Sequence, residues 1–278
     1  MSTILILVIA IISIAVVLPG IVWLGFQIEP AGFPPHPEKT QEAGAVGLPS
    51  NLPEPVRRYS EEVMGSHVPG IESAVVWGKA KMKLSGIWMP VRFKAYYLPG
   101  RTFYRYMEIT WFGRPILKGH DSCIDGEGVL KIEGILNMKE TGNKMDQGQN
   151  LALWGEAVFA PSVFIADPRA SWEAVDEVTA HLVFPFGEQK DRLLFKFDPK
   201  TNLITHISAM RYRGQEEEKT PWLIEFTDWK TFHSVRIPVR FSVAWEDEGS
   251  PWSYWTVEGV EYNVDISDKI PDSRGDKK

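Results

Sequence analysis

Apolar and polar residues alternate with a period of two along most of this chain, and this pattern constrains the fold more than any other feature. From Ile237 to Trp245, for example, every second residue is large and apolar. Such alternation places one row of side chains on each face of a strand. We therefore predict about ten strands, joined mostly by short turns. Their ranges are 75–84, 88–98, 102–112, 129–138, 178–185, 191–198, 203–212, 222–229, 237–246 and 252–265.

Two segments have helical spacing instead. Apolar residues recur every three to four positions in 53–65 and in 147–160, and Asp146 is placed to cap the second helix. A further turn to Ile165 would extend this helical insertion to 147–165. The order helix, four strands, insertion and six strands predicts an α+β, mainly β fold. We expect a strongly curved antiparallel sheet, a half-barrel, with helices packed against one face.

The first 28 residues carry no charged side chain, and Ile4–Phe26 is apolar, small or aromatic throughout. At about 1.5 Å per residue, this stretch is long enough to cross the roughly 30 Å hydrocarbon core of a bilayer. A removed signal peptide usually has a basic start and a small-residue cleavage site, and this segment has neither. We therefore expect residues 1–28 to form an uncleaved transmembrane signal anchor. Few charges flank it, and we favour a cytoplasmic N-terminus with an extracytoplasmic domain.

Composition divides the rest of the chain. Residues 29–50 are rich in Pro, Gly and Ala, which predicts an extended linker that spaces the domain from the bilayer. Residues 51–270 are long enough for one domain with its own core, and 271–278 are expected to be a disordered tail. The formal net charge of −6 argues against nucleic acid as a partner, because binding it requires a basic surface.

Catalytic signatures are missing from the sequence. It has no Gly-x-Ser-x-Gly elbow, no His-Glu-x-x-His motif and no Gly-rich phosphate or dinucleotide loop. Cys123 is the single cysteine. His120 is close to it in sequence, but both lie in a Gly-rich stretch that resembles a turn. A catalytic triad assembled from residues far apart in the sequence remains an alternative, because no local motif would mark it. We predict no cofactor and no catalytic residue, and we favour binding over catalysis.

The acidic segment 121–127 holds three carboxylates and a glycine, a composition that can bind Ca²⁺. It lacks the EF-hand spacing and the bidentate glutamate, whereas Asp125-Gly126 is typical of a tight turn. His120 and Cys123 are too few to hold zinc on their own. We therefore predict no metal site.

Four lysines fall on one face of the first predicted hairpin. A two-residue Gly86-Ile87 turn would set like charges opposite one another on this face. A three-residue loop at 99–101 would set Arg92 opposite Glu108 and offset part of that repulsion. This basic patch either meets lipid head groups or an acidic partner, or is a solvated outer face. Its members are Lys79, Lys81, Lys83 and Lys94.

Ionisable residues interrupt three otherwise apolar rows. If these rows line a cavity, each such group must be paired or hydrogen-bonded. Arg105 would pair with Glu258 or hold a ligand carboxylate or phosphate through two hydrogen bonds. A bulge that reverses the local facing, or a strand end at the rim, is the alternative reading. With aromatics from the same strands, the candidate ligand-binding residues are Arg105, Glu258, His206, Trp111, Trp252 and Tyr254.

Three stretches of the body resemble an uncharacterised bacterial domain-of-unknown-function family. They are the Leu-Pro-x-Pro-Val-Arg-Arg-Tyr opening at 52–59, the segment Gly119–Gly128, and the Trp-Glu-Ala-Val-Asp segment at 172–176. The resemblance spans about 52–270. Such domains look like the lipoprotein-carrier (LolA-like) superfamily. That resemblance implies a half-barrel sheet, capped by helices over an apolar cavity, and no settled activity.

Three functions fit these features. The first is a membrane-anchored domain that binds a lipid or other amphiphile in the hollow of its sheet, with the insertion as a lid. The second is a structural or protein-interaction module whose sheet interior is filled. The third is an undetected hydrolase. The volume of the hollow separates the first from the second, because ligand pockets usually enclose several hundred Å³.

Overall fold

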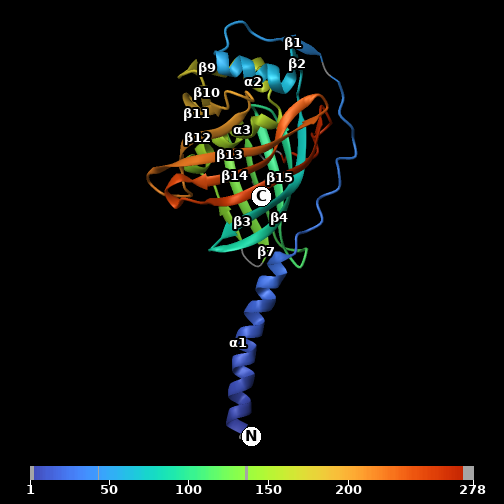
Figure 1. The fold of residues 1–278 in the computed structure, drawn as a ribbon, viewed down its shortest axis with the longest axis vertical. Helices are drawn as coiled ribbons and strands as arrows, with labels where there is room; N and C mark the ends of the chain where they lie inside the picture. The colour runs from blue at the N-terminus through green and yellow to red at the C-terminus, as the bar shows by residue number, and fades with distance from the viewer. Residues whose placement is uncertain (1–2, 43, 135–136, 272–278) are drawn as a thin grey trace.

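The computed structural model describes residues 3–42, 44–134 and 137–271. A long N-terminal helix projects from one end of a large curved sheet, and a second helix covers the opposite end (Figure 1). We call the covered end the capped end and the other the α1 end. The helices are α1 (Thr3–Gln27), α2 (Glu54–Met64), α3 (Asn143–Gly155) and α4 (Val163–Ala166), and the 3-10 turns are η1 (Glu156–Phe159) and η2 (Glu246–Glu248).

Thirteen antiparallel strands form the main sheet within the described residues. A separate pair, β1 (Ala45–Gly47) and β2 (His67–Pro69), lies at the capped end. The strands of the main sheet are β3 (Ala74–Leu84), β4 (Ile87–Leu98), β5 (Thr102–Trp111), β6 (Arg114–Ile124), β7 (Glu127–Gly134), β8 (Met138–Glu140), β9 (Ser171–Ala174), β10 (Thr179–Phe186), β11 (Gln189–Phe197), β12 (Ile204–Tyr212), β13 (Lys219–Phe232), β14 (Val235–Trp245) and β15 (Pro251–Tyr262).

The strand order explains where the helical insertion lies. The sheet runs from β8 through β3 to β15 and on to β9, so β8 and β9 are its two edges and β3 pairs with β15 in the middle. The chain between the two edges must therefore pass from one to the other. It does so across the concave face as α3, η1 and α4, which thereby bridge the opening of the half-barrel.

The predicted mainly β fold with a curved, unclosed antiparallel sheet is confirmed, but the strand count differs. The sequence prediction lacks β6 and β9, and its single strand at 129–138 overlaps two strands, β7 and β8. Leu136 of that predicted strand lies outside the described residues. The helix predicted at 147–160 begins earlier, at Asn143. Asp146 is not its cap, because its carboxylate accepts a hydrogen bond from the Gly128 N–H at 2.7 Å.

Turn chemistry sets the register of the first hairpin. The turn is Ser85-Gly86, not the predicted Gly86-Ile87, and both residues have positive φ, 48° and 82°. This is the backbone of a type I′ turn, whose twist matches that of the strands. Lys79 therefore lies opposite Arg92. The predicted three-residue loop at 99–101 is confirmed, and it sets Arg92 opposite Glu108.

A second predicted turn is also confirmed. Asp125 and Gly126 join β6 to β7 with φ of 52° and 82°, again the values of a type I′ turn. Asp and Gly suit these positions because both tolerate positive φ.

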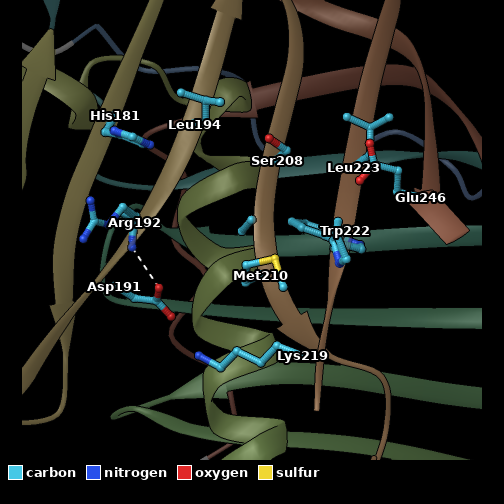
Figure 2. A pocket seen from close by; sticks show the side chains of 12 residues that line it. His181, Asp191, Arg192, Leu194, Ser208, Met210, Lys219, Trp222, Leu223 and Glu246 are labelled. Atoms are coloured by element: carbon cyan, nitrogen blue, oxygen red, sulfur yellow. Dashed lines mark hydrogen bonds between the residues drawn. The ribbon is translucent and has the colours of Figure 1, made fainter. Parts of the chain in front are cut away.

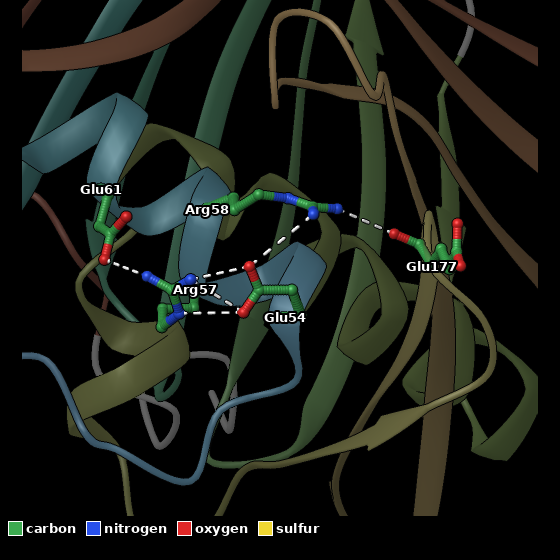
Figure 3. A network of polar contacts seen from close by, with 5 residues as sticks. All are labelled: Glu54, Arg57, Arg58, Glu61 and Glu177. Atoms are coloured by element: carbon green, nitrogen blue, oxygen red, sulfur yellow. Dashed lines mark hydrogen bonds and ion pairs between the residues drawn. The ribbon is translucent and has the colours of Figure 1, made fainter.

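Helix α2 closes the capped end with its apolar face. Val56, Tyr59 and Val63 are buried, as their helical spacing predicts, and the Tyr59 ring lies 5.7 Å from that of Phe197. Its outer face carries a network of ion pairs (Figure 3). Arg57 binds Glu54 and Glu61 one turn away on either side, a spacing that stabilises exposed helices modestly.

The insertion fills the capped half of the concave face with aromatic side chains. Trp154 stacks on Phe184 at 5.1 Å between ring centroids, and Phe164 meets Phe195 edge-on at 5.4 Å. Both pairs join a residue of the insertion to a strand of the β9–β15 half. Burial of rings of this size contributes most of the local packing energy.

The predicted N-terminal helix forms as α1, and its last turns contact the sheet. The Trp111 indole N–H donates to the Val22 carbonyl at 3.1 Å, and the Phe112 N–H donates to the Gly25 carbonyl at 2.9 Å. Among the residues that the structure describes, no helix is both long enough and apolar enough to qualify as a membrane span. The transmembrane role of 1–28 therefore stays a prediction.

Part of the predicted linker lies against the convex face of the sheet. Lys94 donates to the Pro34 carbonyl at 2.8 Å, and Arg92 lies 4.5 Å from the Phe33 ring. Further along, the Glu261 carboxylate accepts hydrogen bonds from the Thr40 N–H at 2.8 Å and its hydroxyl at 2.6 Å. We call the segment 29–42 the strap. Sequence composition predicts its extended backbone but not the surface that binds it.

We expect acid to release the end of the strap near Thr40. Burial opposes ionisation of Glu261, but the hydrogen bonds from Thr40 and Lys39 outweigh it and lower the pKa of this carboxyl. A lowered folded-state pKa means that the stabilisation is present above the unfolded value near 4.3 and is lost as pH falls through the folded value. Limited proteolysis of 36–44 should therefore accelerate below about pH 4.

The matched control is Glu261→Gln, which keeps an acceptor oxygen but cannot ionise. Its strap should be cut faster than that of the wild type at neutral pH, with little further change on acidification. Identical pH profiles for the two proteins would contradict the role of Glu261.

Candidate functional site: a cavity between the sheet and α3

A cavity of about 280 Å³ lies between the concave face and α3, in the half of the barrel that the insertion leaves unfilled. Its walls are mostly apolar and come from β3 to β8 on one side and β12 to β15 on the other. Apolar lining residues include Met82, Leu84, Met107, Ile109, Leu117 and Ile132. Met138, at the α1 end, is 40% exposed, so the cavity reaches solvent at that end.

A saturated ion-pair cluster forms the inner end of the cavity. Arg105 binds both carboxylate oxygens of Asp121, and it donates to Glu156 Oε1 at 2.6 Å. The second oxygen of Glu156 accepts the Tyr97 hydroxyl proton at 2.5 Å. All four carboxylate oxygens therefore have a donor within the protein.

Burial makes this cluster a strongly coupled unit. Arg105, Asp121 and Glu156 are each at most 9% exposed. Burial alone disfavours the charged guanidinium, but the two carboxylates outweigh it and raise the pKa of Arg105. The pKa of Tyr97 is also raised, by burial and by the Glu156 charge. These contacts fix the side chains of the cluster relative to one another, which suits a structural element.

Arg211 is a second cavity arginine, and it has a different environment. Its guanidinium carbon lies 4.8 Å from the centroid of the Trp222 ring. Room for it comes from Gly148 on α3, where a Cβ would lie 2.9 Å from Arg211 Nε. Burial lowers the pKa of Arg211 to about 10, although the Asp121 and Glu156 charges oppose the shift. Within the described part of the chain, Arg211 makes no ion pair, because both nearby carboxylates pair with Arg105.

Buried polar atoms without partners also line this cavity. Trp222 is 3% exposed and Gln149 is 4% exposed. The indole N–H groups of Trp222 and Trp252 and the Oε1 atom of Gln149 find no hydrogen-bond partner among the described residues. Such atoms are costly to bury unless a ligand or water satisfies them.

The predicted partner of Arg105 is wrong. Glu258 lies on the convex face, where its carboxylate is 3.3 Å from the Lys79 ammonium. A register shift between Val257 and Gly259 interrupts the alternation of β15 and turns Glu258 outward. This is the bulge that the sequence left open as an alternative. Glu258 offsets the repulsion between Lys79 and Arg92 rather than facing a ligand.

The other sequence candidates also divide between the two faces. Trp252 lines the cavity, as predicted. His206 lies 3.9 Å from Glu225 and away from the cavity, because β12 changes register against β11 near Lys196. Trp111 contacts α1, and Tyr254 is 49% exposed on the convex face. Of the six candidates, the structure brings only Arg105 and Trp252 to the cavity.

The basic patch is largely occupied by the protein itself. Lys81 lies 3.5 Å from Glu29 of the strap, in addition to the contacts of Lys79 with Glu258 and of Lys94 with Pro34. Lys83 is exposed beside the Ser85-Gly86 turn. The strap therefore covers much of the surface that the sequence assigned to head groups or an acidic partner.

Neither a Cys/His pair nor a metal cluster forms within the described residues. Cys123 is 1% exposed, and burial raises the pKa of its thiol to about 12, which makes it a poor nucleophile. His120 is on the opposite face, 5.2 Å from the Tyr104 ring. No group of three or more potential metal ligands occurs in residues 3–42, 44–134 and 137–271.

A second hollow of about 450 Å³ lies on the convex side of β10 to β13 (Figure 2). Leu194, Ser208 and Met210 point into it, and Met210 is 50% exposed. It holds none of the residues proposed from sequence, and it is an open groove rather than an enclosed cavity. The hollow beneath α3 is therefore the better candidate site.

Residues 45–257 match the family of unknown function DUF6544. The chain belongs to this family. The match covers most of the chain and confirms the resemblance to a domain-of-unknown-function family that the sequence motifs indicate. No curated protein matches the chain.

Several solved structures are similar to this DUF6544 protein. They include a LolA superfamily protein from Nitrosomonas europaea, with 9% identity, a TM-score of 0.46 and coverage of 78% of this chain and 94% of that one. A putative outer membrane lipoprotein-sorting protein domain from Vibrio parahaemolyticus has 6% identity, a TM-score of 0.42 and the same two coverages. A DUF1329 family protein from Desulfovibrio piger has 14% identity, a TM-score of 0.42 and coverage of 78% and 96%.

Proposed function

We propose that this protein binds a lipid or other amphiphile in the cavity beneath α3. The observation that carries the proposal is the cavity itself, which is apolar along its walls and polar at its inner end. An acyl chain along the apolar walls would gain roughly 0.8 kcal/mol per buried CH₂ group. At about 280 Å³ the cavity is close to the lower size limit of small-molecule sites, so the bound portion is short or single-chained.

We also propose that 4–26 holds the protein at a membrane, with the cavity opening toward that membrane and the domain outside the cytoplasm. The 23 uncharged residues of this segment support the membrane anchor. Contacts of Trp111 and Phe112 with α1 support a cavity that opens toward the membrane, because they fix the α1 end of the sheet beside the helix. Protease access to the domain in intact and in opened membrane vesicles tests the orientation.

The experiment that tests ligand binding is native mass spectrometry of the full chain, released from detergent micelles. We expect one adduct of defined mass per chain, identifiable after organic extraction. A chain without an adduct, which also takes up no added fatty acid or alcohol, would overturn the proposal.

A filled interaction module is the second candidate, and one observation favours it. The insertion packs Trp154, Phe159 and Phe164 into the capped half of the barrel, so much of the interior is core. The absence of any adduct in the same experiment would shift support to this reading.

A further inference from the structure

Resting on the proposed binding function, the geometry points to an anionic amphiphile, with Arg211 holding its carboxylate or phosphate head group. The cavity has two arginines, and only one of them has its donors taken by the protein. The argument therefore turns on which acceptors remain for Arg211.

Within the described residues, the two carboxylates of the inner cluster form their ion pairs with Arg105 and not with Arg211. Arg105 occupies both oxygens of Asp121 and one of Glu156, and Tyr97 occupies the other. The guanidinium of Arg211 instead lies over the Trp222 ring, with its carbon 4.8 Å from the ring centroid. Its fork geometry matches two oxygens of one carboxylate or phosphate.

The Trp222 N–H supplies a second, independent sign of a missing acceptor. This group is buried, has no partner in the part of the chain that the structure describes, and belongs to the ring against which Arg211 lies. An oxygen-rich head group beside this ring would satisfy the indole and the guanidinium together. A neutral hydrocarbon end would leave both unsatisfied, which is unfavourable for buried polar groups.

Gly148 provides the space in which the guanidinium of Arg211 lies. An alanine Cβ would lie 2.9 Å from Nε and 3.2 Å from Nη2, closer than such contacts normally come. A glycine in this helix interior costs stability relative to alanine. The space that it leaves is taken by the guanidinium.

The test is photolabelling of the full chain in phosphatidylcholine nanodiscs with diazirine forms of dodecanoate, dodecyl phosphate and dodecanol. Mass spectrometry counts the labelled peptides that line the cavity. We expect about tenfold or more cavity labelling with the two anions than with dodecanol, as a charge-assisted hydrogen bond of 1.5–3 kcal/mol implies.

Variants assign this preference to a residue. Arg211→Met should bring labelling by both anions down to the dodecanol level, and Arg211→Lys should retain part of the preference. Gly148→Ala keeps the charge but displaces the guanidinium, so it should also lower anion labelling. The control is Arg213→Met, one residue beyond the end of β12. Arg213 also lies over a tryptophan ring, that of Trp245, but it is already paired with Asp247.

The outcomes separate the two proposals. Equal cavity labelling by dodecanol and by the anions would overturn the anion assignment and leave amphiphile binding standing. An anion preference that survives in Arg211→Met would also overturn it. No cavity labelling by any of the three probes would overturn the binding function itself.

Discussion

Replacing Arg105 with methionine is expected to lower the free energy of unfolding by about 3–5 kcal/mol, because two buried carboxylates lose their cation. Asp121 and Glu156 are 6% and 9% exposed, so water cannot readily replace the guanidinium. Urea unfolding of the full chain in a mild detergent, followed by tryptophan fluorescence, measures the change.

The control for this prediction is Arg236→Met. Arg236 pairs with Glu62 on the surface, where both side chains are about one-third exposed. Such pairs contribute about 0–1 kcal/mol. Equal losses for the two variants would show that the Arg105 cluster is solvated and not the buried unit described above. The triple variant with Asp121→Asn and Glu156→Gln should recover part of the loss, since it removes the unpaired charges.

Filling the cavity with Ala152→Phe should abolish the bound amphiphile while the protein stays folded. Ala152 lies on the cavity side of α3 and is 3% exposed, so an added ring enters the space that the ligand would take. We expect the adduct in native mass spectra to fall at least about tenfold, equivalent to 1.4 kcal/mol of binding. Overpacking is expected to cost about 1–3 kcal/mol of stability, which near-ultraviolet circular dichroism and thermal melting monitor.

Ser208→Phe is the matched control, because it adds the same ring to the convex groove of Figure 2. An adduct that survives Ala152→Phe but disappears in Ser208→Phe would move the site to that groove. Loss in neither variant would show that the adduct binds elsewhere.

Much of the sheet follows from the sequence because half-buried strands need alternating side chains. Strand β6, which the sequence analysis did not predict, shows which strands this pattern misses. Its inward positions include Gly119 and Asp121, which are small or charged, so no apolar row marks the buried face. Asp121 is tolerated there only because Arg105, on the neighbouring strand, lies directly opposite.

The site was harder to predict than the fold, since small irregularities reverse which side a residue faces. A register shift in β15 turns Glu258 outward, and another near Lys196 turns His206 away from the cavity and Arg211 toward it. Arg105 could be identified because a charge within an apolar row needs a partner. Its partner Glu156 lies on the insertion, and no local pattern connects the two. Gly148 within an otherwise helical segment is the one sequence signal of a close approach near Arg211.

The central pairing of β3 with β15 has a consequence for how the chain folds. Each half of the sheet is a meander of neighbouring hairpins, whose contacts are local and quick to form. The seam between the halves joins Ala74 to Tyr262, near the two ends of the domain. Long-range closure of this kind is slow, so the two meanders are expected to form first and the seam to close last. Until it closes, β3 and β15 are both open edges on which a second copy of the chain can pair, which makes late folding the stage most exposed to aggregation.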